Sequence, residues 1–449
     1  MSTQPLLIIV LAAGKGVRMR SDLPKVLHRI GGRSMLAHVL ATAQEAGAAR
    51  LALVVAPGMG SVRAEASGAH PGIEIFEQAS QSGTADAVLA ARPALEGHRG
   101  DVIVLFADTP LVEAATLRKL TAALQAGAGI AAMGFEPADP SGYGRLIVDG
   151  QGRVSAIREH NDASEAERRI GLCNAGAMAF RVPDLAGLLG RIGNANAKSE
   201  FYLTDAIALA ARDGLATRPV VCSAEEAMGV NSREQLAAAE AVFQARARLQ
   251  AMQGGATLIA PETVWFSFDT QIGRDVTIEP NVFFGPGVVV EDGAQILANC
   301  HMVGVRIRSN ARVGPFARFR PGADIGVGAH VGNFVEVKNA KLEQGAKANH
   351  LSYIGDGRVG EGANIGAGTI FCNYDGFNKH VTDIGKGAFV GSNTSLVAPV
   401  KVGDGAYIAS GSVITKNVDA DALAIERSPQ EQRPGWAAKF RALMKNRKK

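Results

Sequence analysis

A glycine turn with two basic residues follows the first apolar run of the sequence. The run "LLIIV" leads into "LAAGKGVRMRSDLPKVL", residues 11–27, which contains Gly14, Arg18 and Lys25. The N–H groups of such a turn can point at an anion, and the two cations add charge that suits phosphate. A P-loop would need Ser or Thr after "GK", and a dinucleotide fingerprint would need a third glycine where Met19 stands. The segment therefore predicts a phosphate-binding turn of another class.

A single carboxylate stands at the exit of another apolar run. The segment "DVIVLFADTPL" is typical of a buried strand, and Asp108 follows that strand. In a parallel sheet, Asp108 and the glycine turn would share the carboxyl edge, where ligands bind. Mg²⁺ typically uses one or two carboxylates together with substrate phosphates. Asp108 is therefore a candidate Mg²⁺ ligand, although a carboxylate at a strand end also serves as a helix cap or a turn former.

The elements that must position these residues alternate over residues 1–230. The candidate strands are "LLIIVLA", "LALVV", "IEIF", "VIVLFA", "GIAAMGF" and "CNAGAMAFR", and Ala-rich helical segments separate them. This alternation predicts a Rossmann-like, mainly parallel α/β sheet that helices cover on both faces. Residues 232–253 predict one helix, because Ser232 and Gln235 have capping-box spacing. Its thin apolar face favours a linker helix, residues 231–254, between two domains.

The sequence pattern changes at residue 255. Apolar residues recur every six positions, with short register slips, from Ile272 to Ile414. Period six is the repeat of a parallel β-helix, in which each hexad forms one side of a thin triangular core. Stacked neighbouring coils supply the stability of such a domain, which we predict over residues 255–449. Residues 371–383, "FCNYDGFNKHVTD", interrupt the hexads, and a loop on a regular solenoid is a frequent place for function.

Charge and cysteine content limit the classes of function. The net charge is +4, but the last eleven residues carry six positive charges and no acid, so the rest of the chain is slightly acidic. This distribution excludes a nucleic-acid-binding face and leaves a basic C-terminal tail, which is either solvated and partly disordered or phosphate-binding. The four cysteines form no CxxC motif, and no apolar run reaches the roughly 20 residues of a membrane span. A cytoplasmic enzyme without a membrane partner is expected.

Several motifs resemble those of a known family. The segments "LAAGKGVRM…LPKVL", "EQASQSGTADA", "FADTPL", "GYGRL", "REHNDA", "CNAGAM" and "GVNSREQL" are similar to motifs of sugar-1-phosphate nucleotidyltransferases. Joined to a hexapeptide solenoid, they resemble bacterial bifunctional N-acetylglucosamine-1-phosphate uridyltransferases and glucosamine-1-phosphate acetyltransferases. The resemblance covers essentially the whole chain. It implies a left-handed β-helix, a homotrimer, Mg²⁺ as cofactor, and UTP, acetyl-CoA and the two sugar phosphates as substrates.

The resemblance implies a role for individual residues of the uridyltransferase site. Asp108 and Asn231 would bind Mg²⁺, and Asn231 would also contact the nucleotide. The other residues implied to bind UTP or the UDP-sugar are Leu11, Ala13, Gly14, Arg18, Lys25, Gln78, Gly83, Thr84, Gly144, Glu159 and Asn174. Within this set, Gln78 would read uracil with Gly83 and Thr84, and Glu159 would hold the N-acetyl sugar.

The resemblance also implies a second site on the solenoid. His350 would be the general base that deprotonates the glucosamine amine, and the backbone N–H of Ser392 would stabilise the oxyanion. The residues implied to bind the sugar phosphate are Arg320, Lys338, Tyr353, Asn364 and Lys379. The residues implied to contact acetyl-CoA are Ala367, Asn373, Tyr374, Ser392, Ser410 and Arg427.

Other interpretations of the same residues remain open. Gln78 is also compatible with a polar surface position, Asn231 with a cap of the linker helix, and Glu159 with a solvated charge run. Four residues depart from the family pattern in the expected pocket: Phe106, Ala107, Ala175, and Asp86 where His is common.

The solenoid leaves three rival functions for the chain. It could be a regulatory or oligomerising part of a single-activity nucleotidyltransferase, or the whole chain could be a scaffold without activity. A hexapeptide-repeat carbonic anhydrase would bind zinc through three histidines, here His301, His330 and His350, although their spacing offers no close pair.

Overall fold

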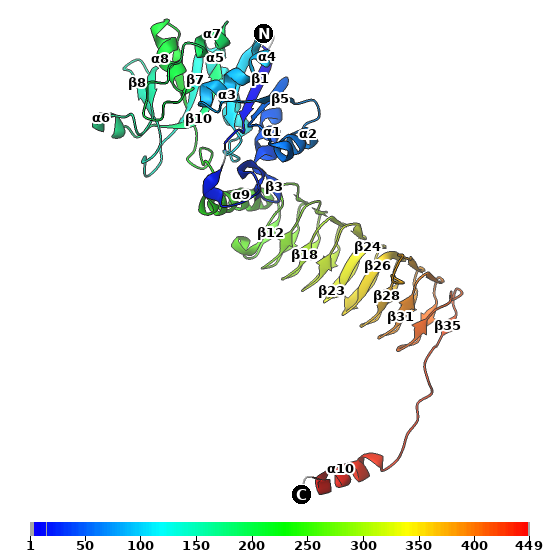
Figure 1. Ribbon diagram of the computed structural model, residues 1–449. Coiled ribbons are helices and arrows are strands. Elements are labelled where there is room, and N and C mark those ends of the chain that lie inside the picture. The colour runs from blue at the N-terminus through cyan, green and yellow to red at the C-terminus, as the bar shows by residue number, and fades with distance from the viewer. Residues whose placement is uncertain (1–3, 15, 448–449) are drawn as a thin grey trace. The chain divides into compact units, whose positions relative to one another are not determined.

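The chain divides into two compact units. The computed structural model describes residues 4–14 and 16–447. The first unit is Met1–Arg246 and the second is Ala247–Lys449 (Figure 1). No helix among the described residues is both long and apolar enough to cross a bilayer.

The first unit is built on one mixed sheet in the order β11-β7-β10-β6-β1-β4-β5. Its central strand β1 (Leu6–Leu11) pairs in parallel with β4 (Arg50–Val55) and β6 (Asp101–Phe106), so the carboxyl ends of these strands meet at one edge. The remaining strands are β5 (Glu74–Glu77), β7 (Ile130–Phe135), β10 (Cys173–Phe180), β11 (Thr217–Val221) and the attached hairpin β8 (Arg145–Val148) and β9 (Val154–Arg158). Since β10 runs antiparallel to β6 and β7 and the main path is otherwise parallel, the predicted mainly parallel sheet is confirmed.

Helices cover both faces of this sheet, as predicted. Successive residues of β1 point to opposite faces: Ile8 and Val10 lie in one buried cluster, and Leu7 and Ile9 lie in another. The first cluster includes side chains of α1 (Met35–Glu45), α2 (Gly60–Ala69) and α5 (Ala114–Gln125). The second includes side chains of α3 (Thr84–Ala90), α4 (Arg92–Leu95), α7 (Leu185–Leu189) and α8 (Asp205–Arg212). The shorter elements are η1 (Val17–Met19), η2 (Lys25–Leu27), β2 (Arg29–Ile30), β3 (Arg33–Ser34) and α6 (Glu165–Arg168).

The helix α9 (Arg233–Gln253) matches the predicted linker helix closely. Its first turns brace the segment that follows the glycine turn: Arg233 Nε donates to Met19 O at 3.2 Å, and Glu240 Oε2 accepts from Gly31 N at 2.8 Å. Its last turns belong to the second unit, because Ala247 and Ala251 pack against the core of the solenoid. The boundary between the two units therefore falls inside the helix.

The second unit is a left-handed parallel β-helix. Strands pair in parallel with strands three hexads later, as Ile278 with Ile296 and Phe284 with Met302. Every predicted anchor from Ile278 to Ile414 is buried in one cluster, while the first anchor, Ile272, is partly buried at the end of the stack. The period-six prediction is thus confirmed residue by residue.

The strands of the β-helix stack into extended sheets (Figure 1). One sheet consists of β12 (Thr257–Leu258), β14 (Thr277–Ile278), β17 (Gln295–Ile296), β20 (Arg312–Val313), β23 (His330–Asn333), β25 (Lys347–His350), β27 (Asn364–Ile365), β30 (Phe389–Val390), β33 (Tyr407–Ile408) and β35 (Leu423–Ala424). The strands of the other sides are β13 (Gln271–Ile272), β15 (Phe283–Phe284), β16 (Val289–Val290), β18 (His301–Met302), β19 (Val305–Ile307), β21 (Arg318–Phe319), β22 (Ala323–Ile325), β24 (Glu336–Leu342), β26 (Tyr353–Val359), β28 (Ile370–Cys372), β29 (Thr382–Ile384), β31 (Ser395–Val397), β32 (Val400–Val402) and β34 (Val413–Ile414). A short helix, η3 (Pro261–Thr263), lies near the start of the solenoid.

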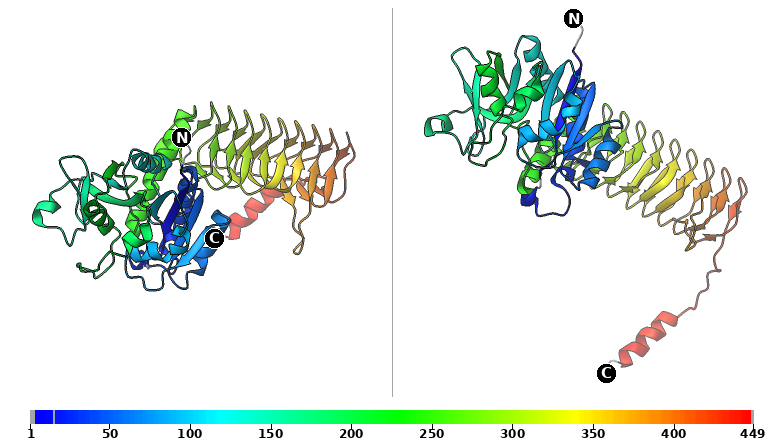
Figure 2. Two further views of the ribbon diagram at one scale, coloured as in Figure 1. Left: turned by 90° about the horizontal axis from the view of Figure 1, so that it is seen from above. Right: turned by 45° about the horizontal axis from the view of Figure 1, so that its top comes forward.

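Two segments depart from the regular coils. Residues between β28 and β29 form the predicted insertion, which projects from the solenoid in Figure 2 and carries Phe377 at 91% exposure. The basic tail forms the exposed helix α10 (Trp436–Arg447) as far as the structure describes it. Lys448 and Lys449, the last residues of the predicted tail, lie outside the described residues.

Candidate active sites

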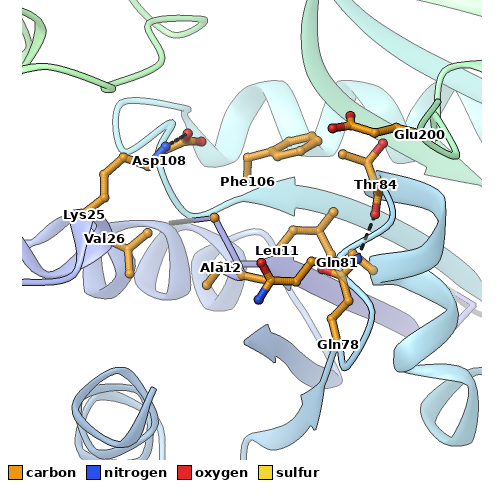
Figure 3. Close-up of a pocket in the computed structure, with 14 residues that line it drawn as sticks. Leu11, Ala12, Lys25, Val26, Gln78, Gln81, Thr84, Phe106, Asp108 and Glu200 are labelled. Atoms are coloured by element: carbon orange, nitrogen blue, oxygen red, sulfur yellow. Dashed lines mark hydrogen bonds and ion pairs between the residues drawn. The ribbon is translucent and has the colours of Figure 1, made fainter. Parts of the chain in front are cut away.

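A pocket opens at the carboxyl edge of the sheet in the first unit (Figure 3). It lies where β1 and β6 end, because the glycine turn and Asp108 leave the sheet side by side there. The residues implied by the resemblance that line it are Leu11, Ala13, Gly14, Lys25, Gln78, Gly83, Thr84 and Asp108. A Cβ at Gly14 would meet no atom within 4 Å, so the space beside this backbone is open to a ligand.

One end of the pocket gathers a cation and two oxygen donors. Lys25 Nζ lies 2.5 Å from Asp108 Oδ2 and donates to Asn231 Oδ1 at 3.0 Å. Gly16 packs against Lys25: its φ is 61°, and a Cβ there would lie 2.6 Å from Lys25 Cβ. Arg18, also implied to bind phosphate, is exposed and lies outside the set of described residues that line the pocket.

The opposite end of the pocket is built around Gln78, which is only 5% exposed (Figure 3). Its Nε2 donates to Gly83 O at 2.9 Å and to Asp86 Oδ2 at 2.7 Å. Gly83 is required at its position, since its φ is 130° and a Cβ would lie 2.5 Å from Phe201 O. Thr84 Oγ1 accepts from Leu203 N at 2.8 Å, which fixes the start of α3.

The residues implied to hold the sugar form a third group. Asn174 N donates to Gly144 O at 2.8 Å, and a Cβ at Gly144 would lie 3.5 Å from Glu159 Oε2. Burial raises the pKa of Glu159, and the hydrogen bond from Thr204 Oγ1 at 3.1 Å opposes this shift only in part. Asn174 Oδ1 accepts from Gly176 N, and Gly176 packs on the ring of Phe106, which lines the pocket. The group therefore adjoins the pocket through Phe106.

The four departures from the family pattern were expected in the pocket, and the structure places them differently. Phe106 lines the pocket as expected, and Asp86 accepts a hydrogen bond from Gln78, while Glu200 lines the pocket without having been predicted. The other two departures from the family pattern, Ala107 and Ala175, are buried in the core. The sequence identified Phe106 and Asp86 only as departures from the family pattern. Their contacts with Gly176 and Gln78 could not be predicted, because the fold brings these residues together.

On the solenoid, His350 lies at the end of β25 next to an amide. Asn333 and His350 are register partners on neighbouring coils, and His350 Nδ1 lies 2.6 Å from Asn333 Oδ1. Because the carbonyl oxygen of an amide only accepts, Nδ1 must carry a hydrogen in this contact, and the neutral tautomer that fits it has its lone pair on Nε2. His350 is also exposed, as a base that meets a substrate must be.

Four of the residues implied to contact acetyl-CoA lie along a column that starts at His350: Ala367, Ser392, Ser410 and Arg427. One corner of the solenoid is linked by backbone bonds from Gly368 N to His350 O, from Asn393 N to Ala367 O and from Gly411 N to Ser392 O. Arg427 Nη1 donates to Ser410 O on the last of these turns. In the described part of the chain the N–H of Ser392 has no hydrogen-bond acceptor, so it is free to donate to a ligand.

Asp356 organises the remaining residues of this region, and sequence reasoning missed it. Its carboxylate accepts from Asn339 Nδ2 at 2.7 Å and from Asn373 Nδ2 at 2.5 Å. Burial alone would raise the pKa of Asp356, but these hydrogen bonds and the charges of Lys338 and Lys379 outweigh it and lower the pKa. The residue lies in "SYIGD", three positions after the predicted Tyr353, and this proximity was the only available signal.

The other predicted members of this site lie on neighbouring coils. Asn373 Nδ2 also contacts Tyr353 Oη at 3.5 Å, and Lys379 Nζ lies 5.1 Å from the ring centre of Tyr374. Arg320 Nη1 donates to Glu336 Oε1 at 3.1 Å. Asn364 lies in β27, and its register partner on the preceding coil is Lys347 in β25.

A zinc site is not supported by the solenoid. No group of three or more His, Cys, Asp or Glu side chains that could hold a metal ion exists among residues 4–14 and 16–447. His301 instead stacks on Phe283, with ring centres 4.8 Å apart. The three histidines that the carbonic anhydrase interpretation requires therefore do not form such a group within the described part of the chain.

Comparison with known proteins places these sites in a family context. A family model for the MobA-like NTP transferase domain matches residues 8–260, and one for bacterial transferase hexapeptide repeats matches residues 382–416. The chain is 58% identical over 442 residues to a protein of Azorhizobium caulinodans named bifunctional protein GlmU, with 98% of each chain covered. Proteins of the same name from Xanthobacter autotrophicus and a Bradyrhizobium species are 57% and 56% identical, again with 98% of each chain covered.

Proposed function

The chain belongs to the family of bifunctional GlmU proteins, and from this premise we propose how its two sites divide the work. The protein is a bifunctional enzyme of UDP-N-acetylglucosamine synthesis. It transfers an acetyl group from acetyl-CoA to glucosamine-1-phosphate and a uridylyl group from UTP to N-acetylglucosamine-1-phosphate. We assign uridylyl transfer to the pocket of the first unit, residues 1–230 in the sequence prediction, and acetyl transfer to the solenoid, residues 255–449.

One observation carries the assignment of the uridylyl site. Asp108, Asn231 and Lys25 converge at one end of a pocket whose other end holds Gln78. This arrangement suits a nucleoside triphosphate. Its phosphates need positive charge and metal ligands at one end of the pocket, and its base needs a hydrogen-bonding group, such as an amide, at the other.

Mg²⁺ fits the donor set found here. The carboxylate of Asp108 and the amide oxygen of Asn231 already share one cation, the ammonium group of Lys25. Two protein oxygens completed by substrate phosphates are a usual set for Mg²⁺. When bound there, Mg²⁺ would neutralise charge on the triphosphate.

Uridylyl transfer requires no covalent bond between the protein and a substrate. A phosphate oxygen of the sugar phosphate attacks the α-phosphorus of UTP in line, and pyrophosphate leaves. Lys25 and the open backbone at Gly14 hold the triphosphate, while Gln78 holds the base and Glu159 with Asn174 holds the sugar. Positioning and charge neutralisation supply the rate enhancement.

Acetyl transfer uses the imidazole of His350. Its Nε2 removes a proton from the glucosamine amine as that nitrogen attacks the thioester carbonyl, and the thiolate of coenzyme A leaves. The Ser392 N–H donates to the developing oxyanion. Arg320, Lys338 and Lys379 supply positive charge to the sugar phosphate.

Removal of divalent metal separates the two activities. With EDTA in excess, we expect pyrophosphate release from UTP and N-acetylglucosamine-1-phosphate to fall by about a hundredfold or more, because metal charge stabilisation contributes several kcal/mol. Added Mg²⁺ should restore it. Acetyl transfer, followed as free coenzyme A thiol, should not change. Uridylyl transfer that survives EDTA, or a parallel loss of both activities, would contradict the assignment.

The variant Asp356→Asn tests whether the carboxylate that accepts hydrogen bonds from Asn339 and Asn373 supports acetyl transfer. Asparagine tolerates the φ of 49° at this position, so the substitution removes charge with little backbone strain. Loss of hydrogen bonds to a charged group predicts that kcat/KM of acetyl transfer falls about tenfold to a hundredfold. Asp421→Asn, at a φ of 55° in another turn, is the matched control and should leave both activities intact. An equal effect of the two variants would show that Asp356 has no role in the site.

A homotrimer that works in the cytoplasm completes the proposal. Phe316, Phe334 and Leu351 form an exposed apolar column on successive coils beside His350, and the rings of Phe316 and Phe334 stack at 5.3 Å. An exposed apolar stripe of this kind suits a subunit interface. The four cysteines, all in the described part of the chain, are free thiols, which suits a reducing compartment.

A further inference from the structure

Asp86 lies at the base end of the uridylyl pocket, on the first turn of α3, and the proposed mechanism does not use it. Its Oδ2 accepts from Nε2 of Gln78 at 2.7 Å, and Gly83 O accepts from the same nitrogen at 2.9 Å. A carboxylate and a backbone carbonyl can only accept, so the amide nitrogen of Gln78 must face them. The amide oxygen of Gln78 is therefore turned away from both partners.

Asp86 is itself held in place as an acceptor. Its Oδ2 also accepts from Ser80 Oγ at 2.9 Å and from Ser82 N at 3.1 Å. Burial alone would raise the pKa of Asp86, but the hydrogen bonds from Gln78, Ser80 and Ser82 outweigh it and lower the pKa. The side chain thus stays ionised at neutral pH and has no hydrogen to donate to Gln78.

We propose that Asp86 is a positioning residue that sets the nucleobase preference of the uridylyl site, by presenting only Oε1 of Gln78 to the base. The inference rests on the proposed function, in which Gln78 contacts the base. Among the described residues, Oε1 of Gln78 has no hydrogen-bond partner, although the side chain lines the pocket. A base whose N3 faces Oε1 must then carry a hydrogen on that nitrogen.

This requirement separates the pyrimidines. Uracil carries a hydrogen on N3 and can donate it to Oε1, whereas N3 of cytosine carries a lone pair that would oppose Oε1, and cytosine could donate to Oε1 only through its 4-amino group after a shift of the ring. A site that depends on a substrate hydrogen bond rejects an analogue lacking it, because its own polar group is left unpaired. Thymine has the same N3–H edge as uracil, so this contact does not distinguish UTP from dTTP.

An amide flip would defeat the selection, and Asp86 opposes that flip. In the flipped orientation Nε2 of Gln78 could donate to cytosine N3, but Oε1 would then face the acceptors of Asp86 and Gly83. Asp86→Ala removes the charged acceptor and leaves only the backbone carbonyl. The flipped state should then become accessible and CTP a better substrate.

The test measures kcat/KM for UTP and for CTP by pyrophosphate release, with N-acetylglucosamine-1-phosphate as acceptor. For Asp86→Ala we expect the UTP:CTP ratio to fall by about tenfold or more, the loss of one discriminating hydrogen bond. Gln78→Ala should lower the ratio as well, and the double variant should show no further fall, since both changes act through one contact. Acetyl transfer, measured on the same preparations, reports that the solenoid is intact, and retained turnover of UTP reports that the first unit is folded. Glu96→Ala, an exposed change at the end of α4, is the control.

The outcomes separate this inference from the assignment of the site. A Gln78→Ala ratio that falls while the Asp86→Ala ratio stays at the wild-type value would overturn the role of Asp86 alone. Equal losses with UTP and CTP in Asp86→Ala would also overturn it, because a merely structural role lowers both. A ratio unchanged in Gln78→Ala would overturn the proposed base contact itself.

Discussion

Asp108→Ala should abolish uridylyl transfer and leave acetyl transfer at its wild-type rate. The substitution removes one of two protein oxygens that meet the cation at the phosphate end of the pocket, and among the described residues it leaves Asn231 as the hydrogen-bond partner of the Lys25 ammonium group. The loss of a preorganised group that stabilises charge in the transition state typically costs a hundredfold to a thousandfold in rate. We therefore expect pyrophosphate release from UTP to fall by at least about a hundredfold.

Two further variants sharpen this experiment. Asp108→Asn keeps an oxygen donor without the charge and should retain more activity than Asp108→Ala at high Mg²⁺ concentration. Asp213→Ala breaks an exposed ion pair with Arg191 outside the pocket and should change neither reaction. A folded Asp108→Ala protein that lost both activities, or kept both, would refute the assignment of this pocket.

The parts of the fold that the sequence predicted well are those set by local spacing. A hexad anchor such as Ile278 or Val331 points inward because of its position in the repeat, so period six alone identifies the core. The glycine turn and Asp108 were also predictable together, since the ends of parallel strands meet at one edge. Their convergence on Lys25 follows from that topology.

The parts that sequence reasoning missed depend on contacts across coils or across a loop. Asn333 faces His350, and Asn339 faces Asp356, only because adjacent coils stack in register. Each pair is 17 residues apart and not the 18 of three full hexads, because a one-residue register slip shortens these coils, so a strict period of six does not give the pairs. Arg18 shows the converse: its type suits phosphate, but the turn leaves its side chain exposed outside the pocket lining.

His350→Ala should give the opposite result from Asp108→Ala. Without a base for the glucosamine amine, acetyl transfer should fall by about a hundredfold to ten-thousandfold, the usual range for general base catalysis. Uridylyl transfer should persist, which shows that the first unit is folded, and an unchanged circular dichroism spectrum should show the same for the solenoid. His301→Ala, which removes another exposed solenoid imidazole, is the matched control and should affect neither reaction.

Asn333→Ala distinguishes a base from a histidine that only packs. The substitution removes the acceptor that places the hydrogen of His350 on Nδ1, at 2.6 Å, while the imidazole itself remains. A base held in the wrong tautomer or orientation for part of the time should lower kcat of acetyl transfer by about tenfold, less than loss of the ring. The KM for acetyl-CoA should change little. If His350→Ala retained full acetyl transfer, the solenoid would have to carry out this reaction with another base. The proposal that the column from His350 to Ser410 forms the acetyl-transfer site would then be refuted.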